Sequence, residues 1–185
     1  MKFVPHQDAP NIPLEVIEAQ ESENLVIFCG AGISVPSGLP SFSGLVNDVY
    51  KALATTPNEL EQEGLDRWAY DSVLGLLENR IDKDNSQISK VRQKIIERLV
   101  IKDGADLSTH EAILQLSKTS NQNYRLVTTN IDHGFLICNS ELTIDKAPNL
   151  PVPKPHKWES LVHIHGIIDD KDPNGRHIVF TSADF

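Results

Sequence analysis

Apolar residues in this chain form either short continuous runs or stripes with a helical period. The run from Asn24 to Cys29, NLVIFC, is almost entirely apolar and stops at Gly30. Such a run is typical of a strand buried on both faces of a parallel sheet. Beyond Pro40, apolar residues recur with a helical period and predict a helix. This stripe consists of Leu45, Val46, Val49, Tyr50 and Leu53. The resulting order of elements is a strand, a glycine turn and a helix.

From about residue 57 to residue 102 the apolar spacing stays helical, and no run has the pattern of a strand. We expect a helical insertion here, spanning about residues 55–105, beside the sheet. Its stripes consist of Leu65, Trp68, Ala69 and Leu76, and then of Ile88, Val91, Ile95, Leu99 and Val100.

A further helix is expected to begin at Ser108. The residues Ser-Thr-His-Glu have the pattern of a capping box, in which Ser108 and Glu111 satisfy backbone donors reciprocally. Its apolar face would consist of Ile113, Leu114 and Leu116. Three β-rich runs predict further strands at Tyr124 to Thr128, Leu161 to Ile164 and His177 to Phe180.

This order of elements predicts an α/β fold with a mostly parallel sheet of at least four strands flanked by helices. Between the strands, Pro148, Pro151, Pro153 and Pro155 predict an extended connection, and Asp172 to Gly175 predicts a turn. With 185 residues and 20.6 kDa, the chain is large enough for one domain with a core that needs no disulfide or metal.

Composition and charge exclude several classes of protein. Hydrophobic residues make up 39% and charged residues 23%, which fits neither a disordered nor a fibrous chain. A net charge of −9 opposes docking on nucleic acid or an anionic membrane, although a local basic groove stays open. No apolar stretch is long enough to cross a bilayer, and the first eleven residues lack the apolar run of a signal peptide. We expect a cytoplasmic protein without direct nucleic-acid or membrane partners.

The two cysteines, Cys29 and Cys138, lie in apolar runs and are expected to be small buried thiols rather than a bridge. A zinc ribbon requires four cysteines, so no zinc is expected.

Polar residues follow three of the predicted strands, at the positions where open α/β sheets bind ligands. After the first strand comes Gly30-Ala31-Gly32-Ile33-Ser34. The glycines let the main chain approach a ligand, and donors near a helix start suit a phosphate. A simple turn is the alternative, because Val35 breaks the G-x-G-x-x-G pattern of dinucleotide-binding loops.

The second site is Thr128-Thr129-Asn130-Ile131-Asp132-His133, which places an amide, a carboxylate and an imidazole at the end of a strand. Asn130 could equally cap a helix that starts at Ile131. The third site is His163-Ile164-His165-Gly166. Alternation along a strand puts both histidines on one side, where they could bind a metal or serve as structural residues.

Taken together, these sites resemble the sirtuin family in motif content, order and position at strand ends. The run from Gly30 to Phe42, GAGISVPSGLPSF, is followed by Thr-Thr-Asn-Ile-Asp, ending at Asp132, and later by His165-Gly166. The resemblance covers the chain from about residue 24 to its end. It implies a Rossmann-like NAD-binding domain with a smaller helical lobe, and an enzyme that cleaves the bond between nicotinamide and ribose.

The chain also departs from the sirtuin deacylases. It has Pro-Ser-Phe-Ser at residues 40–43 where they have Pro-Asp-Phe-Arg, and Thr-Thr-Asn at residues 128–130 where they have Thr-Gln-Asn. The four-cysteine zinc ribbon that follows their His-Gly motif is missing. These differences resemble the bacterial sirtuin-like branch that hydrolyses NAD, commonly as the effector of an anti-phage defence protein. Family members continue with further elements, so we expect this chain to be the amino-terminal part of a longer protein.

By this resemblance, His165 would be the general base, and Asn130 would hold the ribose hydroxyls and orient water. Asp132 would bind the nicotinamide carboxamide, and Phe42 would cover the nicotinamide. The remaining expected contacts to NAD are the main chain of Gly30, Ala31 and Gly32, the Ser34 hydroxyl, Pro40, Thr129 and Gly166. For His163 and His133 we expect structural roles, because no third metal ligand of suitable spacing is evident.

The expected function is that of an NAD glycohydrolase that releases nicotinamide and ADP-ribose and depletes NAD in anti-phage defence. An NAD-dependent protein deacylase or ADP-ribosyltransferase is one alternative, and a non-catalytic module that senses NAD or ADP-ribose is another. An unrestrained NAD hydrolase would poison its own cell. We therefore expect activity to depend on a homo-oligomer, or on assembly through additional domains or a partner protein.

Overall fold

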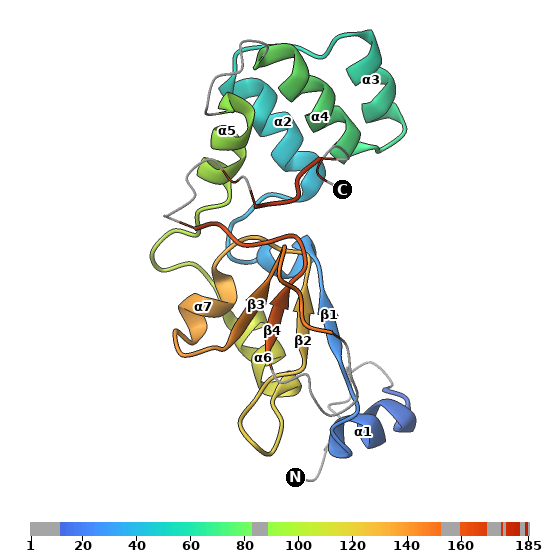
Figure 1. Cartoon of the computed structure of the whole chain (residues 1–185), viewed down its shortest axis with the longest axis vertical. Helices are drawn as coiled ribbons and strands as arrows, with labels where there is room; N and C mark the ends of the chain where they lie inside the picture. Colours follow the sequence, from blue (N-terminus) through green and yellow to red (C-terminus); the bar gives the residue numbers. More distant parts are fainter. Residues whose placement is uncertain are drawn as a thin grey trace.

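The chain forms two lobes that follow one another along its longest axis (Figure 1). The computed structural model describes residues 12–82, 89–152, 160–169, 175, 177–181 and 184. One lobe contains a parallel sheet, and the other consists of helices α2 to α5. The predicted α/β architecture, Rossmann-like with helices flanking a parallel sheet, is confirmed.

The sheet has four strands in the order β1-β2-β4-β3, and every neighbouring pair is parallel. Cys29 lies opposite Thr128, which lies opposite His163, so that three strands end at the same level. Their bounds are β1 Ile27–Cys29, β2 Leu126–Thr128, β3 Ile144–Lys146 and β4 Leu161–His163.

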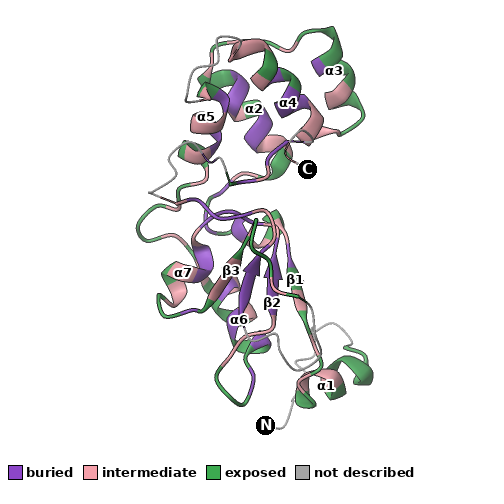
Figure 2. Ribbon diagram, in the orientation of Figure 1, coloured by how far each residue is buried: buried purple, intermediate pink, exposed green. Residues whose placement is uncertain are grey.

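Helices α6 (Ser108–Ser117) and α7 (Gly134–Cys138) belong to the lobe of the sheet. β2 and β4 are buried along their whole length, as Figure 2 shows for β2. Helix α1 (Leu14–Glu21) precedes β1 and buries none of its residues. The core of this lobe consists of Cys29, Leu114, Leu126, Phe135, Leu142 and Leu161.

The prediction that the first strand is buried on both faces is wrong. β1 is shorter than the apolar run, and its central residue, Phe28, is 63% exposed. β1 lies at the edge of the described sheet, where one face of the strand remains open. A continuous apolar run does not distinguish such an edge strand from a central one.

The strand predicted at His177 to Phe180 is also wrong, because these residues form no strand. Ile178 and Phe180 instead pack into the core of the helical lobe. The fourth strand is β3, whose sequence Ile-Asp-Lys is too short and too polar for a strong strand signal. The predicted turn at 172–175, apart from Gly175, lies outside the described residues, as do Pro153 and Pro155.

The predicted helical insertion is confirmed as α3 (Glu59–Asp66), α4 (Tyr70–Ile81) and α5 (Lys90–Arg98). Helix α2 (Phe42–Ala52) joins these three helices and buries the predicted stripe Leu45, Val46, Val49 and Tyr50. The core of the lobe also contains Val73, Leu74, Leu77, Val91 and Ile95.

Some positions of the predicted helical stripes are exposed. Trp68 lies between α3 and α4 with a φ of 62° and is 78% exposed. The chain reverses direction there, so the helical spacing does not continue through it. Leu76 and Val100 are also exposed, whereas Ile88 lies outside the described residues.

The predicted capping box at Ser108 is not formed. Helix α6 starts at Ser108 itself, and the Asp106 carboxylate accepts a hydrogen bond from the Ser108 amide at 2.9 Å. On the expected apolar face Leu114 is buried but Leu116 is exposed. Cys29 is buried as expected, whereas Cys138 is half-buried, and both are free thiols. No helix of the described chain is long and apolar enough to span a membrane.

A buried ion pair between α3 and α4 stabilises the helical lobe. Glu61 on α3 is fully buried and accepts hydrogen bonds from Nε and Nη2 of Arg80 on α4, both at 2.8 Å. The Tyr50 hydroxyl and the Asn58 amide also donate to it. Burial alone would raise the pKa of the Glu61 carboxyl, but these four hydrogen bonds hold it below its usual value. The carboxylate is therefore ionised at neutral pH.

We predict that Arg80→Ala lowers the free energy of unfolding by about 3 kcal/mol, because it leaves the Glu61 charge buried with only neutral donors. Arg67→Ala is the control, since Arg67 and Glu63 form an exposed pair 3.8 Å apart whose loss should cost less than about 1 kcal/mol. Urea denaturation of both variants measures the difference. Equal losses would contradict the prediction.

Candidate functional site

After β1 the main chain turns through Gly30 into a short 3-10 helix, η1 (Ala31–Ser34). Ala31 and Gly32 are exposed, whereas Ser34 is buried. Gly30 lies against the second strand end, because a Cβ there would come within 3.6 Å of Thr129 Oγ1. The loop thus exposes its main chain and buries the Ser34 hydroxyl.

The segment after β2 is fixed by hydrogen bonds to its neighbours. The Thr129 amide donates to the Cys29 carbonyl at 3.0 Å, and the Asn130 amide donates to Thr128 Oγ1 at 2.9 Å. Asp132 Oδ1 accepts from the Gly134 amide at 2.8 Å, at the start of α7. Asn130 therefore does not cap a helix, and its side chain points elsewhere.

The Ser34 hydroxyl connects the first two strand ends. It donates to Asp132 Oδ2 at 2.8 Å and accepts from Asn130 Nδ2 at 2.9 Å. His110 Nε2, from α6, lies 3.3 Å from the same oxygen. All four side chains are buried. This polar cluster fixes the side chains of Asn130 and Asp132 against the Ser34 hydroxyl of the loop.

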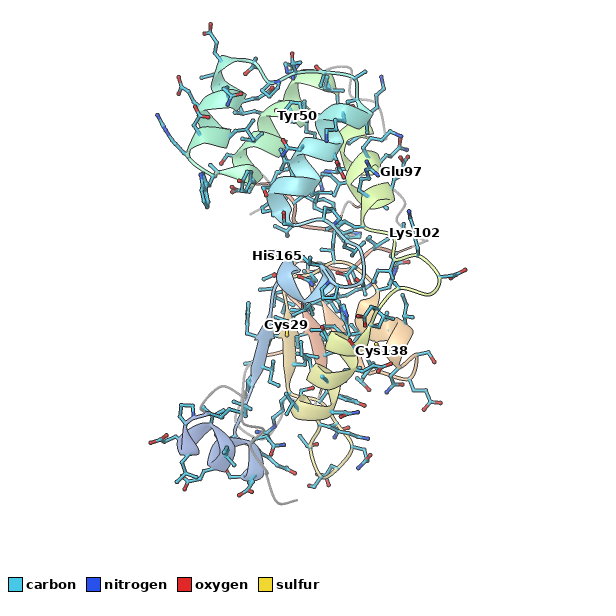
Figure 3. The ribbon with its side chains drawn as sticks, turned by 180° about the vertical axis from the view of Figure 1, so that it is seen from behind. Cys29, Tyr50, Glu97, Lys102, Cys138 and His165 are labelled. Carbon is cyan, nitrogen blue, oxygen red and sulfur yellow. The ribbon has the colours of Figure 1, made fainter. Side chains whose placement is uncertain are left out.

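The two histidines after β4 have different environments. β4 ends at His163, so the side-chain alternation of a strand does not extend to His165, which lies in a turn. His163 is buried, and its Nδ1 lies 2.8 Å from the Asn130 carbonyl oxygen. His165 is half-buried and lies between the two lobes (Figure 3).

His133 contacts the Ile168 carbonyl through Nε2 at 2.7 Å. Both His133 and His163 thus make the main-chain contacts expected of structural histidines. Among the described residues, no group of three or more histidine, cysteine, aspartate or glutamate side chains could hold a metal ion.

Gly166 permits the close approach of residues 177–181, the carboxyl-terminal segment, to the site. Its φ is 81°, and a Cβ at this position would lie 2.5 Å from the His177 carbonyl oxygen. Only glycine combines this conformation with so close an approach. Beyond it, the Val179 amide donates to the His165 carbonyl at 2.9 Å. Residues 177–181 therefore lie directly against the turn that carries His165.

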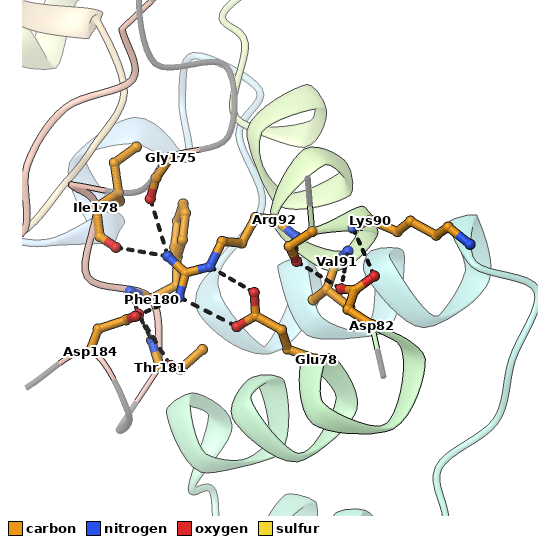
Figure 4. Close-up of polar contacts among 11 residues, drawn as sticks. Glu78, Asp82, Lys90, Val91, Arg92, Gly175, Ile178, Phe180, Thr181 and Asp184 are labelled. Carbon is orange, nitrogen blue, oxygen red and sulfur yellow. Dashed lines mark hydrogen bonds and ion pairs between the residues drawn. The ribbon is translucent and has the colours of Figure 1, made fainter. Parts of the chain in front are cut away.

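Arg92 on α5 fastens this segment to the helical lobe (Figure 4). Its guanidinium donates to both carboxylate oxygens of Glu78, to the carbonyl oxygens of Gly175 and Ile178, and to Asp184. It also lies 5.9 Å from the centroid of the Phe180 ring. One side chain thus fixes the position of the segment that contains Val179 and Phe180.

A cavity of about 470 Å³ lies between the strand ends, the helical lobe and this segment. Eight of the predicted site residues line it: Ala31, Ser34, Pro40, Phe42, Thr129, Asn130, Asp132 and His165. Gly30, Gly32 and Gly166 do not line it. Leu39, Leu45, Asp71, Leu99, Ile131, Val179 and Phe180 complete the wall.

The wall of the cavity is mainly apolar, with few polar groups at one end. Phe42 packs edge-to-face on Tyr70 with 5.6 Å between ring centroids, which supports the apolar side. Asp71 and Asp132 are the only charged residues among the described lining residues. Burial lowers the pKa of the His165 imidazole, so it is neutral at pH 7. The site can therefore accept a proton at His165 and stabilise positive charge.

The described chain thus defines a Rossmann-like α/β protein with a cavity at the carboxyl ends of its strands. No family model matches the sequence. It is 28% identical, over an alignment of 192 residues, to the uncharacterized protein y4cA of Sinorhizobium fredii (strain NBRC 101917 / NGR234). The alignment covers 97% of this chain and 16% of that protein. The name of this relative assigns no activity.

The sequence analysis missed several residues of the site. His110 lies on the buried face of α6 together with Leu114 and Ser117. The helical spacing of these three residues could have indicated this face, but the Ser-Thr-His-Glu sequence by itself indicates only a capping box. Asp71 lies in the first turn of α4 and has no motif around it. Val179 and Phe180 have the sequence pattern of a strand, which gives no indication that they line the cavity.

We predict that Ser34→Ala lowers the free energy of unfolding by about 2 kcal/mol, because it leaves buried groups of Asp132, Asn130 and His110 without a partner. Ser37→Ala is the matched control. Its buried hydroxyl donates only to the Ser34 carbonyl, at 2.7 Å, and should contribute about 1 kcal/mol. Chemical denaturation compares the two, and a larger loss in Ser37→Ala would contradict a central role for the Ser34 hydroxyl.

Proposed function

We propose that this protein is an NAD glycohydrolase that cleaves NAD to nicotinamide and ADP-ribose. The observation that carries the proposal is the lining of one cavity by Asn130, Asp132 and His165, from two neighbouring strand ends, opposite an apolar wall. These are the residue types that the resemblance to the sirtuin family assigns to NAD cleavage.

The chemistry of the reaction fits such a cavity. Nicotinamide leaves a cationic ring as a neutral molecule, so its departure requires no general acid. The barrier lies in the positive charge that develops on the ribose, and carboxylates in a water-poor site stabilise this charge. Water then adds to the ribose carbon and loses a proton, giving ADP-ribose.

The side chains divide this work between them. His165, neutral at pH 7, accepts the proton from water or from a ribose hydroxyl. Asn130 holds the ribose hydroxyls and orients the water. Asp132 binds the nicotinamide carboxamide, because each carboxylate oxygen has a second lone pair beyond its bond to Ser34 or Gly134. Phe42 covers the nicotinamide, and the loop of residues 30–34 meets the diphosphate.

Asp71 adds a role that the resemblance does not assign. It lines the cavity from the helical lobe, whereas Asp132 lines it from the sheet lobe. Negative charge contributed from both lobes favours the cationic nicotinamide ring and the developing ribose cation over neutral or anionic ligands.

We further propose that the activity serves to deplete NAD in the cytoplasm during anti-phage defence and is switched on by assembly. An unregulated NAD hydrolase would harm its own cell. We therefore expect a homo-oligomer, a further domain or a partner protein to switch the NAD hydrolysis on. High turnover by a monomeric full-length protein would contradict this regulation.

The direct test is to incubate the protein with NAD, alone and with candidate activators, and to measure free nicotinamide. Release without any acyl peptide supports a glycohydrolase. Release that requires an acyl peptide supports a deacylase instead. Tight binding of NAD that stays intact, measured by calorimetry, supports a sensing module.

We predict that Asn130→Ala and His165→Ala each lower kcat by at least about 100-fold. His165→Ala should leave stability nearly unchanged, whereas Asn130→Ala should cost about 1 kcal/mol because it removes the buried hydrogen bond to Ser34. The double variant should be scarcely worse than either single one, because residues of one catalytic unit are not additive. His163→Ala is the control. It removes a buried contact to the Asn130 carbonyl and should lower stability more than kcat. If His163→Ala folds but is inactive while His165→Ala remains active, the general base has been assigned to the wrong residue.

The rate should also depend on pH through His165. Burial lowers the pKa of its imidazole from the usual 6.5, and only the neutral form accepts a proton. We predict that kcat/KM stays constant from neutral pH down to below pH 6.5 and falls at lower pH as the imidazole becomes protonated. A pH profile of nicotinamide release measures this. A decline that begins above pH 7 would exclude His165 as the titrating base.

A further inference from the structure

The hydrogen bonds around Ser34 determine which groups donate and which accept. The Ser34 hydroxyl has one hydrogen, and the Asp132 carboxylate at 2.8 Å can only accept it. Asn130 Nδ2 at 2.9 Å and His110 Nε2 at 3.3 Å must therefore both donate to the Ser34 oxygen. If the Asn130 amide were turned around, Ser34 would face two acceptors with a single hydrogen.

This arrangement fixes the tautomer of His110. Its hydrogen lies on Nε2, and Nδ1 carries only a lone pair. Nδ1 is buried and has no hydrogen-bond partner among the described residues, so a second proton there would have no acceptor. Burial lowers the pKa of His110, although the charge of Asp132 opposes this effect. The imidazole is therefore a neutral donor at pH 7.

Packing holds the ring of His110 in place. It meets Phe135 of α7 edge-on, with 5.0 Å between ring centroids. On the Gly134 side there is no room for movement, because a Cβ at residue 134 would lie 2.4 Å from His110 Nε2 and 3.0 Å from Asp132 Oδ1. The ring therefore occupies space that only a glycine leaves open.

We infer that His110 is a positioning residue for the site: its hydrogen bond holds the Ser34 hydroxyl where it donates to Asp132 and accepts from the Asn130 amide nitrogen, which keeps that nitrogen turned away from the ligand. The Asn130 side chain then offers its Oδ1, which accepts no hydrogen bond within the described chain, to a ligand in the cavity. His110 itself does not line the cavity. Its effect on catalysis rests on the proposed function, whereas its tautomer and its effect on Asn130 do not.

Two substitutions separate the hydrogen bond from the packing. His110→Gln keeps a donor at the position of Nε2, and His110→Leu fills similar space without a donor. Leu114→Val, one turn further along the same buried face of α6, is the matched control because it reduces packing only.

The first measurement does not depend on activity. Nitrogen-15 NMR of the wild-type chain at pH 7 should show His110 as the neutral tautomer protonated at Nε2. The side-chain amide resonance of Asn130 should shift in His110→Leu and return toward its wild-type position in His110→Gln. An imidazole protonated at Nδ1 or at both nitrogens, or an Asn130 resonance that is indifferent to His110→Leu, would overturn the inference.

The second measurement is the rate of nicotinamide release from NAD. His110→Leu should lower kcat by about 10- to 100-fold, because small misplacements of catalytic groups have effects of this size. His110→Gln should recover to within about threefold of wild type, and Leu114→Val should lose stability but keep its kcat. A kcat in His110→Leu equal to that of wild type would overturn the positioning role. If the wild-type chain releases no nicotinamide either alone or with any candidate activator, the proposed function fails, and the NMR result still decides the role of His110 toward Asn130.

Discussion

The site depends on the register of three parallel strands. Cys29, Thr128 and His163 lie opposite one another in β1, β2 and β4, so the residues that follow them leave the sheet at one level. A slip of one residue between β1 and β2 would move Asn130 away from Ser34, and a slip between β2 and β4 would move His165 away from Asn130. Either slip would turn every side chain of the slipped strand to the other face. The buried apolar residues of β2 and β4 prevent such a slip, because both faces of these strands are filled. The geometry of the cavity therefore follows from the packing of the sheet.

The helical lobe contributes the apolar wall of the cavity, which lies opposite the polar strand ends. The Glu61 and Arg80 pair fixes α3 against α4, and Phe42 packs on Tyr70 where α2 meets the cavity. The carboxyl-terminal segment closes the remaining side, held by Gly166 at one end and by Arg92 at the other. Most polar groups of the cavity thus lie at the strand ends, whereas exclusion of water depends on the contact between the two lobes.

The sequence predicts the architecture and most of the cavity, because strand runs, helical stripes and glycine turns are local signals. The features it missed depend on contacts between distant residues. Phe28 looks like a core residue until the strand order puts β1 at an edge. Ile178 and Phe180 look like a strand because nothing local indicates that Arg92 draws them to the helical lobe. His110 is a single polar residue in a helix, and only the fold brings it to Ser34.

The Arg92 cluster has a consequence for how this sequence can vary. A guanidinium has five N–H groups, and the contacts of Arg92 to Glu78, Gly175, Ile178 and Asp184 use all of them. Lysine has three donors on one atom and cannot reach acceptors spread around the edge of a planar guanidinium. Natural variants that keep this wall should therefore retain arginine at residue 92. Where residue 92 is not arginine, residues 78 and 184 should have changed as well, so that the three positions vary as a correlated trio on three separate segments of the chain.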